Sequence, residues 1–178
     1  MSRHVFTLTP FPGGPALPLR ISGTAHREGP LLAVTWALTG AIAAVAWPGP
    51  AGVPERRDHL WQQTCCEFFW ARPAAPGYWE ANFSPAGHWQ LYGFDDYRAG
   101  MRPERAIGPP ATTASRSDEA LTLATTLDLS PLCGPEEPLL LGVTMVVRTV
   151  DGATSYWALA HPAAQPDFHH RPGWTLAL

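Results

Sequence analysis

Five polar side chains recur at alternate positions in the central part of the chain: Glu67, Glu80, Asn82, Gln90 and Tyr92. Alternate residues of an extended strand project from the same face of a sheet, so neighbouring strands would gather these groups on one surface. Carboxyl, amide and phenol groups in an aromatic setting are typical of a pocket for a small polar ligand. The alternative is a face that simply meets solvent, as one side of an antiparallel sheet normally does.

The same stretch carries a second, apolar face. Between the polar positions of residues 66–94 stand large aromatic side chains, among them Trp79, Phe83 and Trp89. This strict alternation predicts three consecutive strands with one apolar side. Residues 84–87, Ser-Pro-Ala-Gly, place Pro and Gly where a tight turn between two strands needs them. We therefore predict that Trp79, Phe83 and Trp89 lie in the core.

The rest of the chain also consists of short apolar runs separated by turn residues. Its 178 residues include 20 prolines and 16 glycines. Further strands are predicted at residues 4–10, 17–26, 31–38, 41–47, 120–129, 139–149, 154–160 and 174–178. Asp151-Gly152 is a hairpin signal, and residues 99–118 are a long irregular segment. The pattern predicts one all-β domain, residues 1–178, folded as an antiparallel β-sandwich with little helix.

Composition argues against several classes of function. The net charge is −3, and the twelve basic residues, all arginine, form no cluster, so a nucleic-acid partner is not expected. No apolar run reaches the roughly 18 residues of a membrane span, and the first residues do not resemble a secretory signal. Cys65 and Cys66 are adjacent and Cys133 is alone, which argues against a disulfide framework. These features predict a reduced, cytoplasmic protein.

Several segments resemble DOMON-like domains and the related family 9 carbohydrate-binding modules. The central segments are LWQQTCCEFFW and YWEANFSPAGHWQLYGF, the latter with an E-x-N-x-S-P-x-G strand and turn. PFPGG, FDDYRAGM, SYWALAHP and PDFHHR are similar to segments of stand-alone bacterial DOMON-like proteins. The resemblance spans nearly the whole chain and implies an immunoglobulin-like or jelly-roll-like sandwich of about ten strands. It also implies a pocket at one sheet, where members of the wider superfamily bind haem or sugars.

A sugar or a related small polar ligand is the favoured partner, bound without catalysis. Sugar binding needs aromatic rings against apolar sugar faces and directional polar groups. The candidate ligand-binding residues are Trp61, Glu67, Glu80, Asn82, Gln90, Tyr92, Arg98 and Trp157. For each tryptophan the competing interpretation is a core position. Asp95, Asp96 and Arg98 are expected to form a salt-bridge network at the rim of the site.

Haem is the alternative cofactor, since DOMON cytochrome domains use an axial Met and His pair. Met101 and His161 are the candidates for that pair. No metal site is expected, because Asp167 and His169 supply two ligands where zinc takes three or four. Asp167 is more typical of a residue that caps a turn by accepting hydrogen bonds from nearby backbone amides.

An enzyme and an interaction scaffold are the two remaining classes of function. Glu67 and Glu80 could form a carboxyl pair of the kind that glycosidases use. However, the chain contains no nucleophile elbow, P-loop or dinucleotide fingerprint, so an enzyme is the less favoured interpretation. A scaffold that pairs through an exposed sheet edge, without a small ligand, stays open.

Overall fold

The computed structural model describes residues 2–178 and shows an all-β protein. The strands are β1 (Ser2–Pro10), β2 (Leu19–Glu28), β3 (Leu31–Gly40), β4 (Cys65–Ala71), β5 (Tyr78–Phe83), β6 (Trp89–Phe94), β7 (Arg102–Pro103), β8 (Ala111–Arg116), β9 (Leu121–Asp128), β10 (Leu140–Arg148), β11 (Thr154–Ala158) and β12 (Leu176–Ala177). Three short 3-10 helices join them: η1 (Ile42–Ala44), η2 (Leu60–Gln62) and η3 (Arg171–Gly173).

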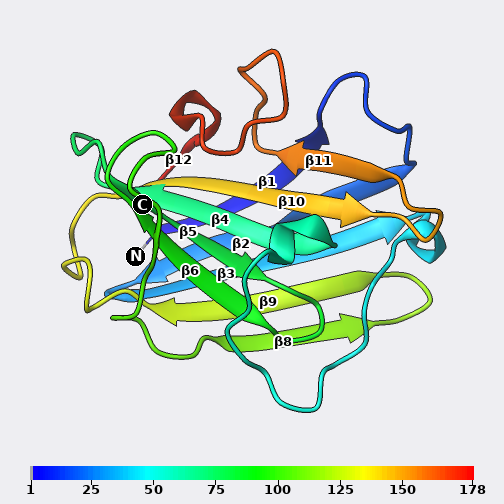
Figure 1. Cartoon of the computed structure of the whole chain (residues 1–178), viewed down its shortest axis with the longest axis horizontal. Coiled ribbons are helices and arrows are strands. Elements are labelled where there is room, and N and C mark those ends of the chain that lie inside the picture. The colour runs from blue at the N-terminus through cyan, green and yellow to red at the C-terminus, as the bar shows by residue number, and fades with distance from the viewer. Residues whose placement is uncertain (1) are drawn as a thin grey trace.

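The strands form two packed antiparallel layers that meet at a narrow seam. Their order is β7-β6-β5-β4-β10-β11-β1-β2-β3-β9-β8, with β12 paired to β10. At the seam β1 pairs with β11 only through Thr9 with Ala158 and Pro10 with Trp157. The layer of β4, β5, β6 and β10 lies in front of the layer of β1, β2, β3 and β9 in Figure 1. The prediction of an antiparallel β-sandwich is therefore confirmed.

Aromatic side chains fill the space between the layers. Trp36 of β3 lies 6.3 Å from Phe68 and 6.4 Å from Phe83, measured between ring centroids. Its indole N–H donates to the carbonyl of Thr144 at 3.2 Å, so this buried polar atom is satisfied. Phe83 and Trp89 are buried in this core, as the alternation predicted. The third predicted core residue, Trp79, is partly buried and packs at the core margin.

Two predictions of secondary structure were wrong. Residues 41–47 do not form a strand, because β3 ends at Gly40, whose φ of +96° turns the chain into η1. The segment 99–118 is not wholly irregular, since it contains β7 and β8 at the two ends of the strand order. No helix among the described residues is long and apolar enough to cross a membrane.

Candidate functional site

The polar face of β4, β5 and β6 is covered by loops and is not exposed to solvent. Glu67 is only 2% exposed, Glu80 5% and Asn82 0%. Strand pairing sets Glu67 opposite Asn82 and Glu80 opposite Phe69, so the two glutamates are diagonal neighbours on adjacent strands. A plain solvent-facing sheet is therefore the wrong description of this face.

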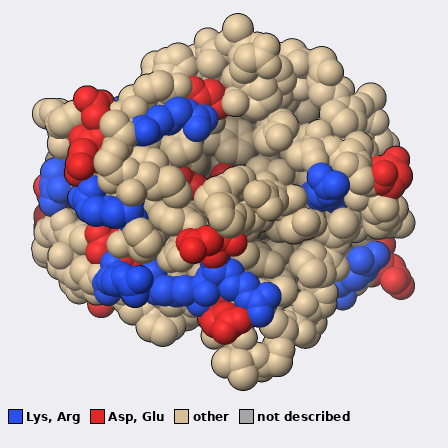
Figure 2. Space-filling view, viewed as in Figure 1, with Lys and Arg blue, Asp and Glu red and all other residues tan. Residues whose placement is uncertain are grey.

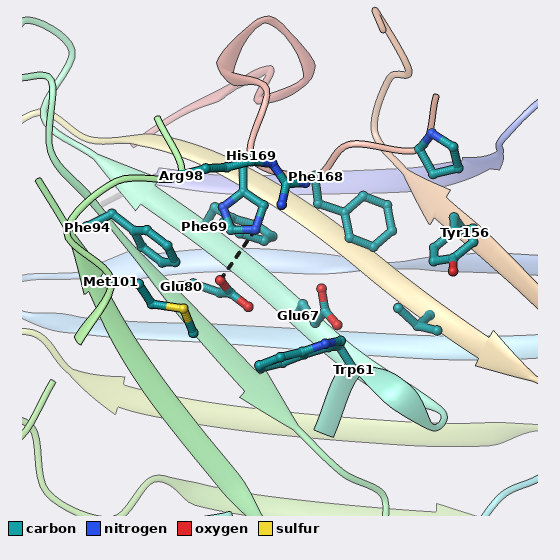
Figure 3. A pocket seen from close by; sticks show the side chains of 12 residues that line it. Trp61, Glu67, Phe69, Glu80, Phe94, Arg98, Met101, Tyr156, Phe168 and His169 are labelled. Carbon is teal, nitrogen blue, oxygen red and sulfur yellow. Dashed lines mark ion pairs between the residues drawn. The ribbon is translucent and has the colours of Figure 1, made fainter. Parts of the chain in front are cut away.

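A cavity of about 320 Å³ lies over this face. Aromatic and other apolar side chains line it around the two glutamates: Trp61, Phe69, Phe94, Met101, Val146, Tyr156, Pro166 and Phe168. Arg98 and His169 complete the lining. In Figure 3 the carboxyl groups of Glu67 and Glu80 lie side by side, with Trp61 on one side and His169 on the other. Figure 2 shows the same face hollowed near its centre, with acidic atoms visible inside the hollow. The site is an apolar pocket, and the carboxyl groups of Glu67 and Glu80 form its acidic floor.

Helix η2 positions the Trp61 ring over the floor. His59 precedes η2 in the left-handed conformation, with φ of +62°, which is uncommon outside glycine. Its imidazole packs edge-on against Trp61 at 5.2 Å, and Trp61 in turn packs against Tyr92 at 5.8 Å. The turn at His59 thus directs the indole toward the pocket.

The opposite wall, residues 166–169, is anchored by Trp174. The indole N–H of Trp174 donates to the carbonyl of Phe168 at 2.8 Å, and its ring stacks on Phe69 at 5.6 Å. This ring occupies the space beside Gly142 of β10, where a Cβ atom would lie 2.3 Å from its Cδ1 atom. Gly142 is therefore needed for the position of Trp174, and through Trp174 for that of Phe168.

Arg98 closes the rim, but its partner differs from the expected one. Its guanidinium pairs with Asp167 at 2.8 Å, whereas Asp95 pairs with Arg102 at 2.7 Å. The expected network of Asp95, Asp96 and Arg98 was therefore wrong, because the loop of Asp167, 69 residues away in sequence, folds against this turn. Asp167 also accepts from the backbone N–H of His169 at 3.1 Å, which confirms its role as a turn cap.

The hydrogen bond between Tyr78 and His169 favours one tautomer of the imidazole. The Tyr78 hydroxyl accepts from the backbone N–H of Arg98 at 3.2 Å, so its own hydrogen is free to donate to Nδ1 of His169 at 2.7 Å. Nδ1 is then an acceptor, and the ring proton sits on Nε2, 3.7 Å from Oε2 of Glu80. Burial, with the nearby Arg98 charge, lowers the pKa of His169 to about 4, although Asp167 acts in the opposite direction. The imidazole is therefore neutral at neutral pH.

We expect Tyr78→Phe to remove this control over the tautomer. Without the hydroxyl, Nδ1 loses its donor, and both neutral tautomers of His169 should be populated. Nitrogen NMR of the imidazole would measure this, with an unprotonated Nδ1 in the parent protein. Tyr156→Phe is the control, because it removes a hydroxyl that does not contact His169. An Nδ1-protonated parent protein would contradict the assignment.

Burial makes both glutamates unusually weak acids. It raises the pKa of Glu80 to about 7, against the opposing effects of the Asn82 hydrogen bond and the Arg98 charge. The Asn82 amide donates to Oε1 of Glu80 at 2.7 Å. Burial and then the Glu80 charge raise the pKa of Glu67 well above its ordinary value. Oε2 of Glu67 has a long contact, 3.5 Å, to the Thr144 hydroxyl, and Oε1 has no hydrogen-bond partner among the described residues.

Other candidate residues lie around the pocket or away from it. Gln90 donates to Asp58 at 2.9 Å and accepts from Arg56 at 3.0 Å, and the Tyr92 hydroxyl also donates to Asp58. These bonds support the sheet under Trp61 and leave neither residue in the cavity lining. Trp157 lies in the core, and its indole N–H donates to the Ser155 hydroxyl. It is therefore a core residue and not a ligand-binding residue.

The two candidate haem ligands have separate surroundings. Met101 lines the pocket, whereas His161 packs on Phe11 at 5.3 Å and contacts the carbonyl of Thr9 at 2.9 Å. His161 is not part of the pocket lining. Within residues 2–178, no group of three His, Cys, Asp or Glu side chains is arranged to hold a metal ion.

Sequence reasoning missed most of the apolar walls. Phe69 and Phe94 have the same parity as Glu67 and Tyr92, so the alternation that found the glutamates also contained these two rings. Phe168 and His169 belong to the PDFHHR segment, in which no wall residue of the pocket was predicted. Nothing local in the sequence shows that this segment folds over β4 and β5.

The fold is shared with two solved structures, a candidate carbohydrate-binding protein and a carbohydrate-binding module. A candidate carbohydrate-binding protein from Bacteroides uniformis superposes with a TM-score of 0.68 at 13% identity, covering 96% of this chain and 84% of that chain. A family 9 carbohydrate-binding module from Caldicellulosiruptor kristjanssonii, solved with cellotriose, gives a TM-score of 0.56 at 7% identity, covering 90% and 74%. No family model and no curated protein matches the sequence. At these identities the likeness establishes the fold.

Proposed function

We propose that this chain is a single DOMON-like domain that binds a sugar without catalysis. The observation that carries the proposal is the pocket itself, in which aromatic side chains surround two buried carboxyl groups. Aromatic rings suit the apolar faces of a sugar, and carboxyl and amide groups suit its hydroxyls. The fold likeness to carbohydrate-binding proteins from two organisms supports this choice.

The size of the cavity favours a small ligand. At about 320 Å³ it lies at the lower end of the roughly 300–1,000 Å³ that ligand pockets span. Trp61 covers one side, so a single sugar ring could stack on the indole while its hydroxyls face Glu67 and Glu80. A monosaccharide, or the end of a longer sugar, is the ligand that this geometry suits best.

Binding is favoured over catalysis because no cysteine is in the pocket lining, and the buried thiols of β4 are protonated. Burial raises the pKa of the Cys65 and Cys66 thiols well above their ordinary value, so both remain protonated. The neutral His169 has Tyr78 rather than a nucleophile on its Nδ1 atom. We also propose a cytoplasmic location, which is supported by three free, buried cysteines.

We expect Trp61→Ala to weaken sugar binding by about tenfold or more, since stacking of an aromatic ring contributes on the order of 1 kcal/mol beyond its buried area. Titration calorimetry with a panel of neutral, acidic and amino monosaccharides would measure the affinities. Trp47→Ala is the matched control, because Trp47 is also partly buried but packs on the core away from this pocket. Equal affinity in both variants, or no binding of any sugar by the parent protein, would contradict the proposal.

A further inference from the structure

The two glutamates at the pocket floor have no cationic partner. The nearest guanidinium, Arg98, is paired with Asp167 at 2.8 Å. The nearest imidazole, His169, is hydrogen-bonded to Tyr78 and neutral, and its Nε2 atom lies 3.7 Å from Glu80, beyond hydrogen-bond distance. Two adjacent carboxyl groups thus lie in an apolar enclosure without an ion-pair partner. Ionising either group there is costly unless a ligand supplies the pairing charge.

One oxygen of the floor points to such a ligand independently. Glu67 lines the cavity, and its Oε1 atom is buried without a hydrogen-bond partner within the described chain. Nearly all buried polar atoms in proteins are satisfied, so an orphaned acceptor calls for a donor from outside the chain. The other oxygen of Glu67 has only the long contact to Thr144, at 3.5 Å. Glu67 therefore has no close hydrogen-bond donor from the described chain.

The walls favour a donor that carries positive charge. Trp61, Phe69 and Phe94 present aromatic rings to the same space. The faces of aromatic rings attract cations, and the effect strengthens when water is excluded. An ammonium group has three N–H donors, enough to reach both glutamates at once. A neutral hydroxyl offers one donor and brings no compensating charge.

We propose that the sugar bound in this pocket carries a protonated amine, which lies between Glu67 and Glu80. The inference rests on the proposed sugar-binding function and narrows it to amino sugars. A free amine is required, since an N-acetylated sugar has neither the charge nor the three donors. The sugar ring would lie against Trp61, with the amine directed to the floor.

Binding of this cation should release a proton. In the empty protein the carboxyl groups hold protons, because burial raises the pKa of both. An ammonium favours their ionised forms, so about one proton per ligand is expected to leave near pH 6. The other groups around the floor are Cys65, whose burial raises the pKa of its thiol and keeps it protonated, and Asn82, Thr144, Arg98, Asp167, His169 and Tyr78, with Tyr92, Asp58 and His59 behind Trp61. Of the groups beside the carboxyl pair, His169 stays neutral above its pKa of about 4, and the pKa of Tyr78 is raised to about 12.

Calorimetry with glucosamine, N-acetylglucosamine and glucose tests the proposal. At pH 6 the amine of glucosamine is protonated, as amines of this type titrate near pH 8. We expect glucosamine to bind at least about tenfold more tightly than the two neutral sugars. Titrations in buffers of different ionisation enthalpy should show the release of about one proton with glucosamine and none with the others.

Glutamine variants of the two glutamates test whether their negative charge, rather than their shape, determines the preference for an amino sugar. Glu67→Gln and Glu80→Gln keep the side-chain volume and should lower the affinity for glucosamine about tenfold more than the affinity for glucose. Glu136→Gln, at an exposed position, is the matched control. Equal affinity for all three sugars without proton release would overturn the amino-sugar inference and leave the proposed function standing. Absence of binding by all three sugars, and by the wider panel, would overturn the proposed function itself.

Discussion

Replacing Glu67 by glutamine is expected to remove much of the loss of stability that the parent protein shows as the pH rises above 4.5. The carboxyl group keeps its proton in the folded protein well above the ordinary pKa of 4.5, but loses it in the unfolded chain. Between the unfolded-state and folded-state pKa values of Glu67, the unfolded chain binds fewer protons than the folded protein. The free energy of unfolding then falls by about 1.4 kcal/mol for each pH unit.

The direction of this effect follows from a raised folded-state pKa. The stability from protonated Glu67 is fully present below pH 4.5 and is lost as the pH rises toward the folded-state pKa. Glu80 acts in the same direction, but its contribution ends near pH 7. His169, whose folded-state pKa is lowered, contributes the opposite slope between about pH 4 and 6.5. The Glu67→Gln variant should therefore keep the slopes that come from Glu80 and His169 and lose the one that comes from Glu67.

Urea unfolding at several pH values would measure these slopes. Glu104→Gln is a suitable control, since Glu104 is a partly buried carboxyl that lies outside the pocket and receives the Trp79 indole N–H at 3.4 Å. The control should keep the slope of the parent protein. A Glu67→Gln variant that still loses stability at the parental rate would contradict a protonated Glu67. Glutamine keeps the shape of the side chain, so a change in slope would reflect the charge.

The second large effect is expected for Gly142→Ala. The added Cβ atom would lie 2.3 Å from Cδ1 and 2.6 Å from Cγ of Trp174, distances that no real contact tolerates. Trp174 is buried between Phe69 and Tyr78, so its ring cannot simply swing away. Overpacking of this kind costs about 1–3 kcal/mol of folding free energy. Because Trp174 holds the carbonyl of Phe168, sugar affinity should fall as well.

Thermal unfolding and near-ultraviolet circular dichroism would follow Gly142→Ala, the second through the altered surroundings of Trp174. Gly49→Ala is the control, since a Cβ atom there would meet no atom within 4 Å. Parental stability and sugar affinity in Gly142→Ala would show that the wall of the pocket does not depend on Trp174.

Alternation predicted the sheet that carries the site because a strand has a period of two. Phe83 and Trp89 are buried between the layers, while Glu80 and Asn82 lie on the other side of the same strands. That separation needs only the sequence of β5 and β6 and the geometry of an extended chain. The same logic identified Glu67 as a neighbour of Asn82, and the two residues are indeed paired across β4 and β5.

The covering loops could not be predicted, because their contacts are distant in sequence. His169 meets Tyr78 across 91 residues, and Arg98 meets Asp167 across 69. Local propensity describes these segments only as turns rich in Pro and Gly. For the same reason the burial of Glu67 and Glu80, which gives both groups their chemistry, was not visible in the sequence.

The seam between β1 and β11 bears on how the molecule reaches its folded state. Thr9 donates to the carbonyl of Ala158 across 149 residues, so the two layers join only when residues from opposite ends of the chain meet. Folds dominated by such distant pairings form slowly, on a scale of about milliseconds to seconds. During synthesis, β4 and β5 would leave the ribosome long before residues 166–169 could cover them. The acidic floor would then be exposed to water until a late step, and the first molecule able to hold a ligand would be a fully folded one.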